Sequence, residues 1–258
     1  MVDAPFLFCY AMDIPMSGHS KWATIKRAKG AADAKRGQQF TKLARGIAVV
    51  AREGGGDPVT NFRLRLAIDK ARSYNMPKDS IDRAIAHGTG KDKEAAAIEE
   101  GLYEGFGPGK VGVLVAVATD NKNRTAGDIK QIFSKHNGAI AGPGSVKWQF
   151  EQKGVIRISG APTDEQELAL IDAGADDIQK EAEGTTVYTA VPNFHTVSDA
   201  VGKLGLTPAD SGLEWVPKDT IAIDDAARAQ LEKLFEALDE HDDVQDFYAN
   251  FDISDEDM

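Results

Sequence analysis

The chain has 258 residues, of which 42% are hydrophobic and 28% are charged, a composition typical of a globular protein. Its length suggests one large domain or two to three small ones. A single cysteine excludes a disulfide framework or a thiolate zinc site, and no apolar run approaches the roughly 18 residues of a membrane helix. The net charge of −11 is divided unevenly, with +10 on residues 16–93 and −19 on residues 94–258. A basic segment ahead of an acidic body predicts a polyanionic partner, and nucleic acid is the polyanion that it favours.

The first 15 residues do not fit a targeting sequence. Residues 4–12 are apolar, but no Lys or Arg precedes them as in a secretory signal, and the arginines of a mitochondrial transit peptide are missing. We therefore expect residues 1–15 to be a disordered extension or a misplaced start, with Met16 as the natural first residue. The expected location is the cytoplasm.

Residues 16–94 are predicted to form a small helical bundle with basic exposed faces. Apolar residues recur at helical spacing on both sides of a Gly-Gly-Gly-Asp-Pro break. The apolar residues of these two helices are Phe40, Leu43, Ile47 and Val50, followed by Leu64, Ile68 and Ala71. Thr60 or Asn61 can cap the second helix, and Pro77 suits the first turn of a third helix that stops at Gly88.

The pattern then changes to strands and helices. A hairpin is predicted between strands at residues 102–106 and 111–119, followed by a helix at 124–136 and a strand at 145–150. The last of these strands would alternate its side chains, with three apolar ones on the same face: Val146, Trp148 and Phe150.

A second strand–helix unit follows. Its predicted strands are residues 155–158, 185–190 and 213–216. Thr163 and Gln166 have the spacing of a capping box that opens one helix, and residues 193–204 form another. A final helix and a strand at 244–251 would complete the first unit, and the helix has four inward residues: Leu231, Leu234, Phe235 and Leu238.

These patterns predict an α+β protein of three domains. A helical bundle is followed by two α+β sandwich (ferredoxin-like) domains, with the third domain inserted in the second. The expected limits are residues 16–94 for the bundle, 95–152 plus 218–254 for the discontinuous domain, 153–217 for the inserted domain and 255–258 for an acidic tail.

No motif for catalysis or cofactor binding is found. The five histidines have no metal-ligand spacing, and neither a nucleophile elbow nor a phosphate-binding loop is present. Residues 224–258 hold 13 acids against two bases, which is more typical of a solvated face than of a catalytic pair. We expect no enzyme activity, cofactor or metal, and the acidic domains offer a surface for a protein partner.

Two groups of residues point to nucleic acid. Residues 16–53 carry nine bases against two acids, and Lys and Arg release counterions when they neutralise phosphates. The predicted nucleic-acid-binding residues are His19, Lys21, Trp22, Lys26, Arg27, Lys29, Lys35, Arg36, Lys42 and Arg45. His19 or Trp22 could stack on a base, although a core position suits Trp22 better.

The second group is a possible anion site between a strand and a helix start, where free N–H groups and the helix dipole favour an anion. Its residues are Asn121, Lys122, Asn123, Arg124 and Thr125. An ordinary capped loop fits the same residues equally well.

Several ordered motifs carry a family resemblance. They are MSGHSKW from Met16, FTKL from Phe40, AREGGGDP from Ala51, LRLAIDKA from Leu64, NMPKD from Asn75, YEG from Tyr103, TDN from Thr119, NRT from Asn123 and YANF from Tyr248. The chain resembles the YebC/PmpR family from Met16 to about Ile253. The resemblance implies three domains, with the third inserted in the second, and no catalytic residue.

The resemblance also leaves two functions open. Family members are named probable transcriptional regulators, and some bind DNA. Mitochondrial relatives are translational activators of cytochrome c oxidase, and bacterial members are linked to stalled ribosomes. The sequence shows no clear DNA-reading helix, so binding to ribosomal RNA is slightly favoured on physical grounds, with the ribosome as partner.

Overall fold

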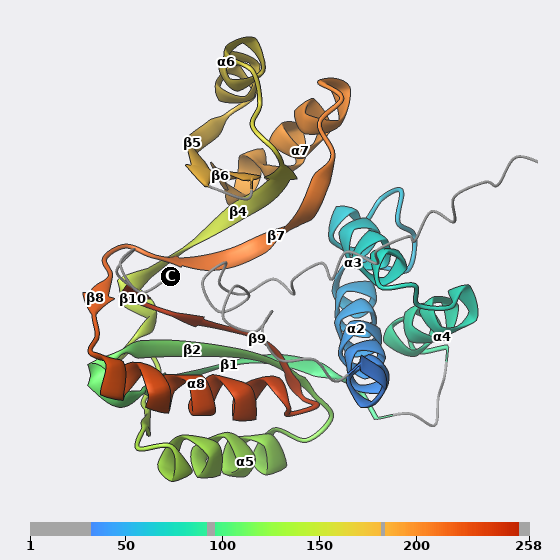
Figure 1. Ribbon diagram of the computed structural model, residues 1–258. Coiled ribbons are helices and arrows are strands. Elements are labelled where there is room, and N and C mark those ends of the chain that lie inside the picture. Colours follow the sequence, from blue (N-terminus) through green and yellow to red (C-terminus); the bar gives the residue numbers. More distant parts are fainter. Residues whose placement is uncertain (1–31, 92–95, 182–183, 253–258) are drawn as a thin grey trace, which may run out of the picture.

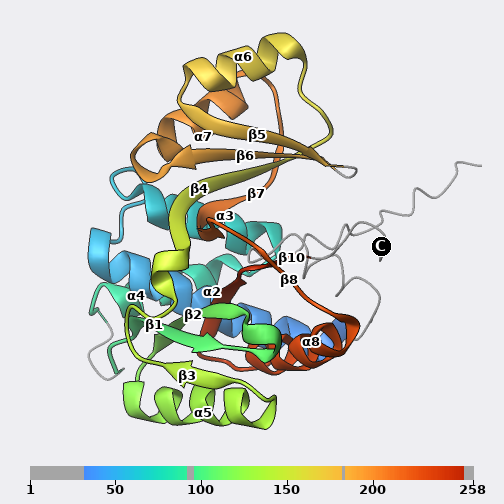
Figure 2. The ribbon, with the colours of Figure 1, turned by 90° about the vertical axis from the view of Figure 1, so that its left-hand side faces the viewer.

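The computed structural model describes residues 32–91, 96–181 and 184–252. They form helices and two four-stranded antiparallel sheets (Figures 1 and 2). This mixed helix and sheet composition agrees with the fold class predicted from the sequence. Three predictions concern residues that lie outside the described part of the chain: the extension at 1–15, the helical structure before residue 32 and the acidic tail at 255–258. No helix in the described part is long and apolar enough to span a membrane.

Three helices form the first part of the described chain: α2 (Ala32–Gly54), α3 (Phe62–Ser73) and α4 (Lys78–Gly88). The predicted cap is confirmed, because the Asn61 side chain accepts a hydrogen bond from the backbone N–H of Leu64 at 3.1 Å. The apolar positions of the three helices share one core, which includes Ile47, Leu64, Ile68, Ala71 and Ile81.

Gly88 allows α4 to approach α2 closely. A Cβ atom at this position would lie 2.1 Å from the backbone oxygen of Ala48, closer than any real contact. Glycine at the end of α4 therefore permits helix packing as well as ending the helix.

The first sheet has the order β3-β1-β2-β9. Its strands are β1 (Glu99–Phe106), β2 (Gly112–Thr119), β3 (Ala139–Ala141) and β9 (Val244–Ala249). The predicted hairpin is confirmed, since β1 and β2 pair in antiparallel register across a short turn at Pro108–Lys110. Helices α5 (Lys122–Lys135) and α8 (Asp225–Asp239) lie together below this sheet in Figure 1 and share its core.

The second sheet has the order β5-β6-β4-β7. Its strands are β4 (Phe150–Ser159), β5 (Ala175–Glu181), β6 (Gly184–Ala190) and β7 (Pro208–Pro217). With α6 (Asp164–Asp172) and α7 (Phe194–Lys203), they give the βαββαβ sequence of ferredoxin-like folds.

The chain enters and leaves the second sheet between β3 and β9. Short strands β8 (Ile221–Ala222) and β10 (Phe251–Asp252) pair in parallel beside the two sheets (Figure 1). The path fits an insertion, and the division into three separately folding domains stays a prediction.

The strand predicted at residues 145–150 is wrong. Residues Lys147–Gln149 form a short 3-10 helix, β4 starts only at Phe150, and the Trp148 side chain is 67% exposed instead of inward. The buried Glu104 carboxylate accepts hydrogen bonds from the backbone N–H groups of Gly144, Val146 and Lys147, and these bonds hold the segment in a turn.

Candidate nucleic-acid interface

Most of the predicted nucleic-acid-binding residues lie outside the described part of the chain. These are His19, Lys21, Trp22, Lys26, Arg27 and Lys29. Lys35 belongs to α2, but its side chain is not among those described. Arg36 is exposed in the first turns of α2 and forms no ion pair with another described residue.

Lys42 and Arg45 face the acidic body instead of the solvent. Lys42 is 4% exposed, and its Nζ donates to the backbone oxygen of Asp239 at 2.5 Å. The Arg45 guanidinium forms an ion pair with the buried Asp243 carboxylate. These two cations therefore join α2 to the end of α8 and the turn before β9, and their charge is used within the chain.

Two further arginines extend this contact between the helical part and the first sheet. Arg52 donates to the Ile98 backbone oxygen at 3.1 Å and lies 3.9 Å from a Glu99 carboxylate oxygen. Arg63 lies 3.3 Å from a Glu100 carboxylate oxygen. Both pairs are about half exposed, so each contributes well under the energy of a buried pair.

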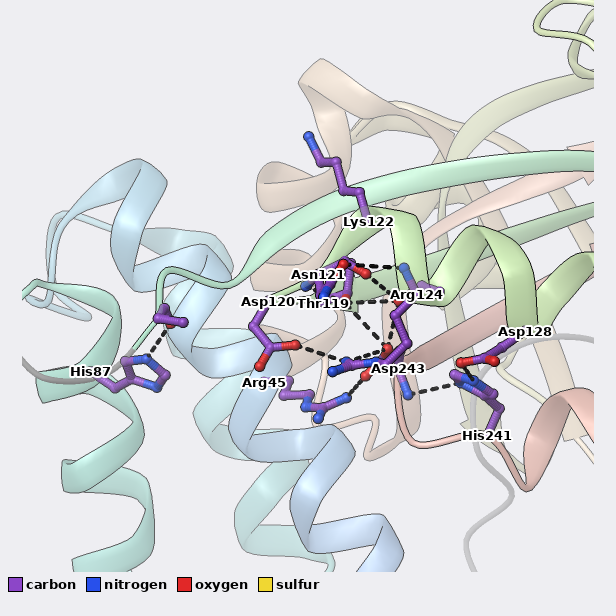
Figure 3. A network of polar contacts seen from close by, with 12 residues as sticks. Arg45, His87, Thr119, Asp120, Asn121, Lys122, Arg124, Asp128, His241 and Asp243 are labelled. Atoms are coloured by element: carbon purple, nitrogen blue, oxygen red, sulfur yellow. Dashed lines mark hydrogen bonds and ion pairs between the residues drawn. The ribbon is translucent and has the colours of Figure 1, made fainter.

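The predicted second anion site is a closed network centred on Asp243 (Figure 3). Asn121 caps α5 by accepting a hydrogen bond from the backbone N–H of Arg124 at 3.1 Å. Arg124 donates to Asp243 at 3.0 Å and to Asp120 at 2.8 Å. The Thr125 hydroxyl donates to Asp243 at 2.6 Å.

The anion beside the start of α5 is thus a carboxylate of the same chain. Burial alone would raise the pKa of Asp243, but hydrogen bonds from Thr125 and Arg124 and the charge of Arg45 lower it to about 2. Lys122 is exposed and pairs with Glu99 at 2.6 Å. These contacts fit the capped-loop alternative, and binding of an external anion here stays a prediction.

The outer surface of the helical part carries the remaining cations. Residues 32–91 contain 12 Lys and Arg against six Asp and Glu. The exposed bases on α3, α4 and the residues after them are Arg63, Arg72, Lys78, Arg83 and Lys91. Of these residues, Lys78 and Lys91 form no ion pair with another described residue, whereas Arg63 pairs with Glu53 and Glu100 and Arg72 pairs with Asp69.

Helices α3 and α4 are joined by only four residues, as in DNA-binding helix-turn-helix units. The exposed start of α4, however, carries two positive and two negative side chains: Lys78, Asp79, Asp82 and Arg83. A recognition helix inserts its first turns between phosphate groups, and two exposed carboxylates there oppose insertion.

Sequence reasoning missed the acidic partners of the basic residues. Lys42 and Asp239 are 197 positions apart, and Arg45 and Asp243 are 198 positions apart. No local spacing could have paired them, because both acids belong to a long acidic segment. Among the described residues, no group of three or more His, Cys, Asp and Glu side chains is placed to hold a metal ion.

The fold and this interface define an α+β protein whose basic helical part is docked on an acidic body. A family model described as the TACO1/YebC protein N-terminal domain matches residues 20–91. A second, described as TACO1/YebC second and third domain, matches residues 98–251. The chain belongs to the TACO1/YebC family, which confirms the resemblance seen in the sequence.

Similar proteins carry regulatory names. A protein of Syntrophus aciditrophicus is 50% identical over 246 residues, covering 94% of this chain and 98% of that protein. One of Rubrobacter xylanophilus is 49% identical over 245 residues, with coverage of 94% and 98%. Both are named "Probable transcriptional regulatory protein". The crystal structure of a conserved hypothetical protein of Aquifex aeolicus is 40% identical, has a TM-score of 0.83 and covers 92% of this chain and 98% of its own.

Proposed function

We propose that this protein is a non-enzymatic regulator of gene expression that binds structured RNA, such as that of the ribosome, through its basic helical part. The most direct support is the uneven distribution of charge, +10 on residues 16–93 against −19 on the rest up to residue 258. The basic helical part attracts a phosphate backbone, and the acidic body repels it. Binding is therefore confined to the helical part.

The ion pairs between the helical part and the body show which bases to leave out of the proposed interface. Lys42 and Arg45 hold the helical part on the body and are not offered to phosphates in the proposal. The contact residues are instead the bases before α2, above all Lys26, Arg27 and Lys29, together with the exposed Arg36 and Lys78. Ion pairs to the body keep α2 in a fixed orientation, which fixes the position of Arg36 relative to the body.

Structured RNA suits this surface better than a DNA operator. RNA helices are recognised through backbone and shape, which requires cations but no side chains aimed at base edges. The two carboxylates among the charged residues at the start of α4 oppose insertion into a major groove.

A second candidate is a DNA-binding transcriptional regulator, which the names of the similar proteins favour. A regulator of this kind should bind its operator by orders of magnitude more tightly than random duplex. A genome-wide binding selection that enriches no such sequence removes this candidate.

The experiment is a binding measurement by fluorescence anisotropy with a ribosomal RNA fragment and a random DNA duplex. The helical triple variant carries Lys26→Glu, Arg27→Glu and Lys29→Glu. We expect it to lose binding at moderate salt and to lower the slope of log affinity against log salt concentration by about 3, because each lost phosphate contact removes nearly one counterion.

A matched control changes the same charge on the body. The body triple variant carries Lys130→Glu, Lys135→Glu and Lys233→Glu, all at exposed positions of α5 and α8. It should bind RNA like the unmodified protein, apart from a small general loss due to its more negative charge. Equal losses in the two variants, or unchanged affinity of the helical triple variant, would overturn the assignment of the interface.

A further inference from the structure

Trp148 is the exposed aromatic residue of the body. Of the Phe, Tyr and Trp side chains that the structure describes, it alone is exposed, with 67% of its surface open to solvent. A single exposed apolar side chain is common on protein surfaces and by itself indicates nothing. Three features of its surroundings distinguish Trp148: a rigid turn, an oriented indole ring and exposed lysines nearby.

The segment that presents Trp148 is held rigidly. The Glu104 carboxylate is 6% exposed and accepts three backbone hydrogen bonds, from Gly144 at 2.6 Å, Val146 at 2.7 Å and Lys147 at 2.8 Å. Burial would raise the pKa of Glu104, but these bonds lower it, so the carboxylate is charged at neutral pH. Val146 is fully buried and anchors the segment from below.

The indole ring itself is also oriented. Its Nε1 donates to the Ser145 backbone oxygen at 3.0 Å, so the polar edge of the ring is already satisfied within the turn. A partner therefore has no need to supply an acceptor, and the free surface of Trp148 is apolar and aromatic. Such a surface is suited to stacking, because every nucleobase has a π face.

Two exposed lysines belong to the turn or lie beside it. Lys147 is adjacent in the chain, is exposed and lies with its Nζ 4.9 Å from the ring centre of Trp215. The backbone N–H of the exposed Lys218 donates to the Gln149 backbone oxygen at 2.9 Å, which places it beside the same turn. Neither lysine forms an ion pair with another described residue, and residues 142–149 contain no acid.

This turn lies away from the helical part. It leads directly into β4, whose first residue pairs with Pro217 at the end of β7. Figure 1 shows that end of β4 on the left of the molecule, with α2, α3 and α4 on the right. A ligand on Trp148 is thus a second contact and not an extension of the basic helical surface.

We propose that Trp148 is a stacking platform for an unpaired base of RNA, with Lys147 and Lys218 contacting the phosphates on either side. The proposal rests on the proposed function, because the basic helical part would hold the same RNA at a distance. A protein partner is disfavoured as the occupant, since the exposed lysines of the turn and beside it suit phosphates and the hydrogen-bond donor of the ring is already used. Unpaired bases in loops and bulges are the part of RNA that proteins bind by stacking.

The test uses the full chain with Trp22→Phe and Trp215→Phe, which leaves Trp148 as the one tryptophan of the three in the sequence. A short single-stranded oligoadenylate should quench its fluorescence. In the otherwise unmodified protein, Trp148→Ala should weaken binding of this probe about 5- to 100-fold, whereas Trp148→Phe should retain most of the affinity. Trp215→Phe serves as the matched aromatic control and should change the affinity little.

A fully paired RNA duplex separates this proposal from the proposed function. Trp148→Ala should leave duplex binding unchanged, while the helical triple variant should weaken it. Unquenched fluorescence, or equal affinity of Trp148→Ala and the unmodified protein for oligoadenylate, overturns the stacking proposal even if duplex binding follows the helical bases. Quenching and loss in Trp148→Ala support it, even if the helical triple variant binds normally and the proposed interface fails.

Discussion

Replacing Asp243 with Asn should disconnect the helical part from the first sheet. The substitution keeps the shape of the side chain and removes the charge that Arg45, Arg124 and Thr125 share. The pKa of Asp243 falls from 3.8 to about 2 in the folded state, and a lowering of this size corresponds to about 2 kcal/mol of stability at neutral pH. We expect Asp243→Asn to lower the free energy of unfolding by about this amount in urea denaturation.

The control is Asp120→Asn. Asp120 pairs with the same Arg124 at 2.8 Å, but the two side chains are 40% and 46% exposed. Surface pairs of this kind contribute at most about 1 kcal/mol. If Asp243→Asn destabilises the protein no more than Asp120→Asn does, the network around Asp243 does not hold the helical part in place.

The pH dependence gives an independent check. Because the pKa of Asp243 is lower in the folded than in the unfolded state, its contribution is complete above the unfolded value of 3.8 and is lost as the pH falls to about 2. The stability difference between the unmodified protein and Asp243→Asn should therefore shrink between pH 4 and pH 2. A difference that stays constant through this window would refute the electrostatic explanation.

Three further substitutions test the packing by urea denaturation. Gly88→Ala places a Cβ atom against the Ala48 backbone oxygen and should lower the free energy of unfolding by about 1–3 kcal/mol. Gly90→Asn is the control and should cause no loss, because a Cβ atom at position 90 meets no atom within 4 Å. Asn61→Ala removes the cap of α3 and should cost about 1–2 kcal/mol, and an unchanged midpoint would contradict the role of the cap. Glu214→Gln leaves the mostly buried Arg157 without its bidentate carboxylate and should cost about 3–5 kcal/mol, more than Lys180→Gln at a pair whose lysine is half exposed.

Local patterns predicted most of the helices and their ends. Leu64, Ile68 and Ala71 repeat at helical spacing, and the same three residues are buried in α3. Thr163 and Gln166 form the expected capping box, because both partners of the motif lie within one turn. Such features depend on neighbours in the chain and so are visible in the sequence.

Features that depend on distant residues could not be predicted in this way. The sequence does not predict strand β5 (Ala175–Glu181), because its polar residues have a low propensity for strands. The segment forms a strand because it pairs with β6. Trp148 was expected inward, since nothing nearby shows that Glu104, more than 40 positions earlier, holds its segment in a turn. The charge of Arg45 in α2 likewise predicts nucleic-acid binding, because its partner Asp243 lies 198 positions away in the chain.

Crosslinking of the protein to nucleic acid in living cells, followed by sequencing, tests RNA binding by the helical part most directly. The unmodified protein is compared with the helical triple variant and the body triple variant. We expect reads concentrated on ribosomal RNA that are lost in the helical triple variant and kept in the body triple variant. Reads concentrated at a few promoters, and lost in the same helical variant, would contradict the RNA assignment and make the protein a regulator of transcription.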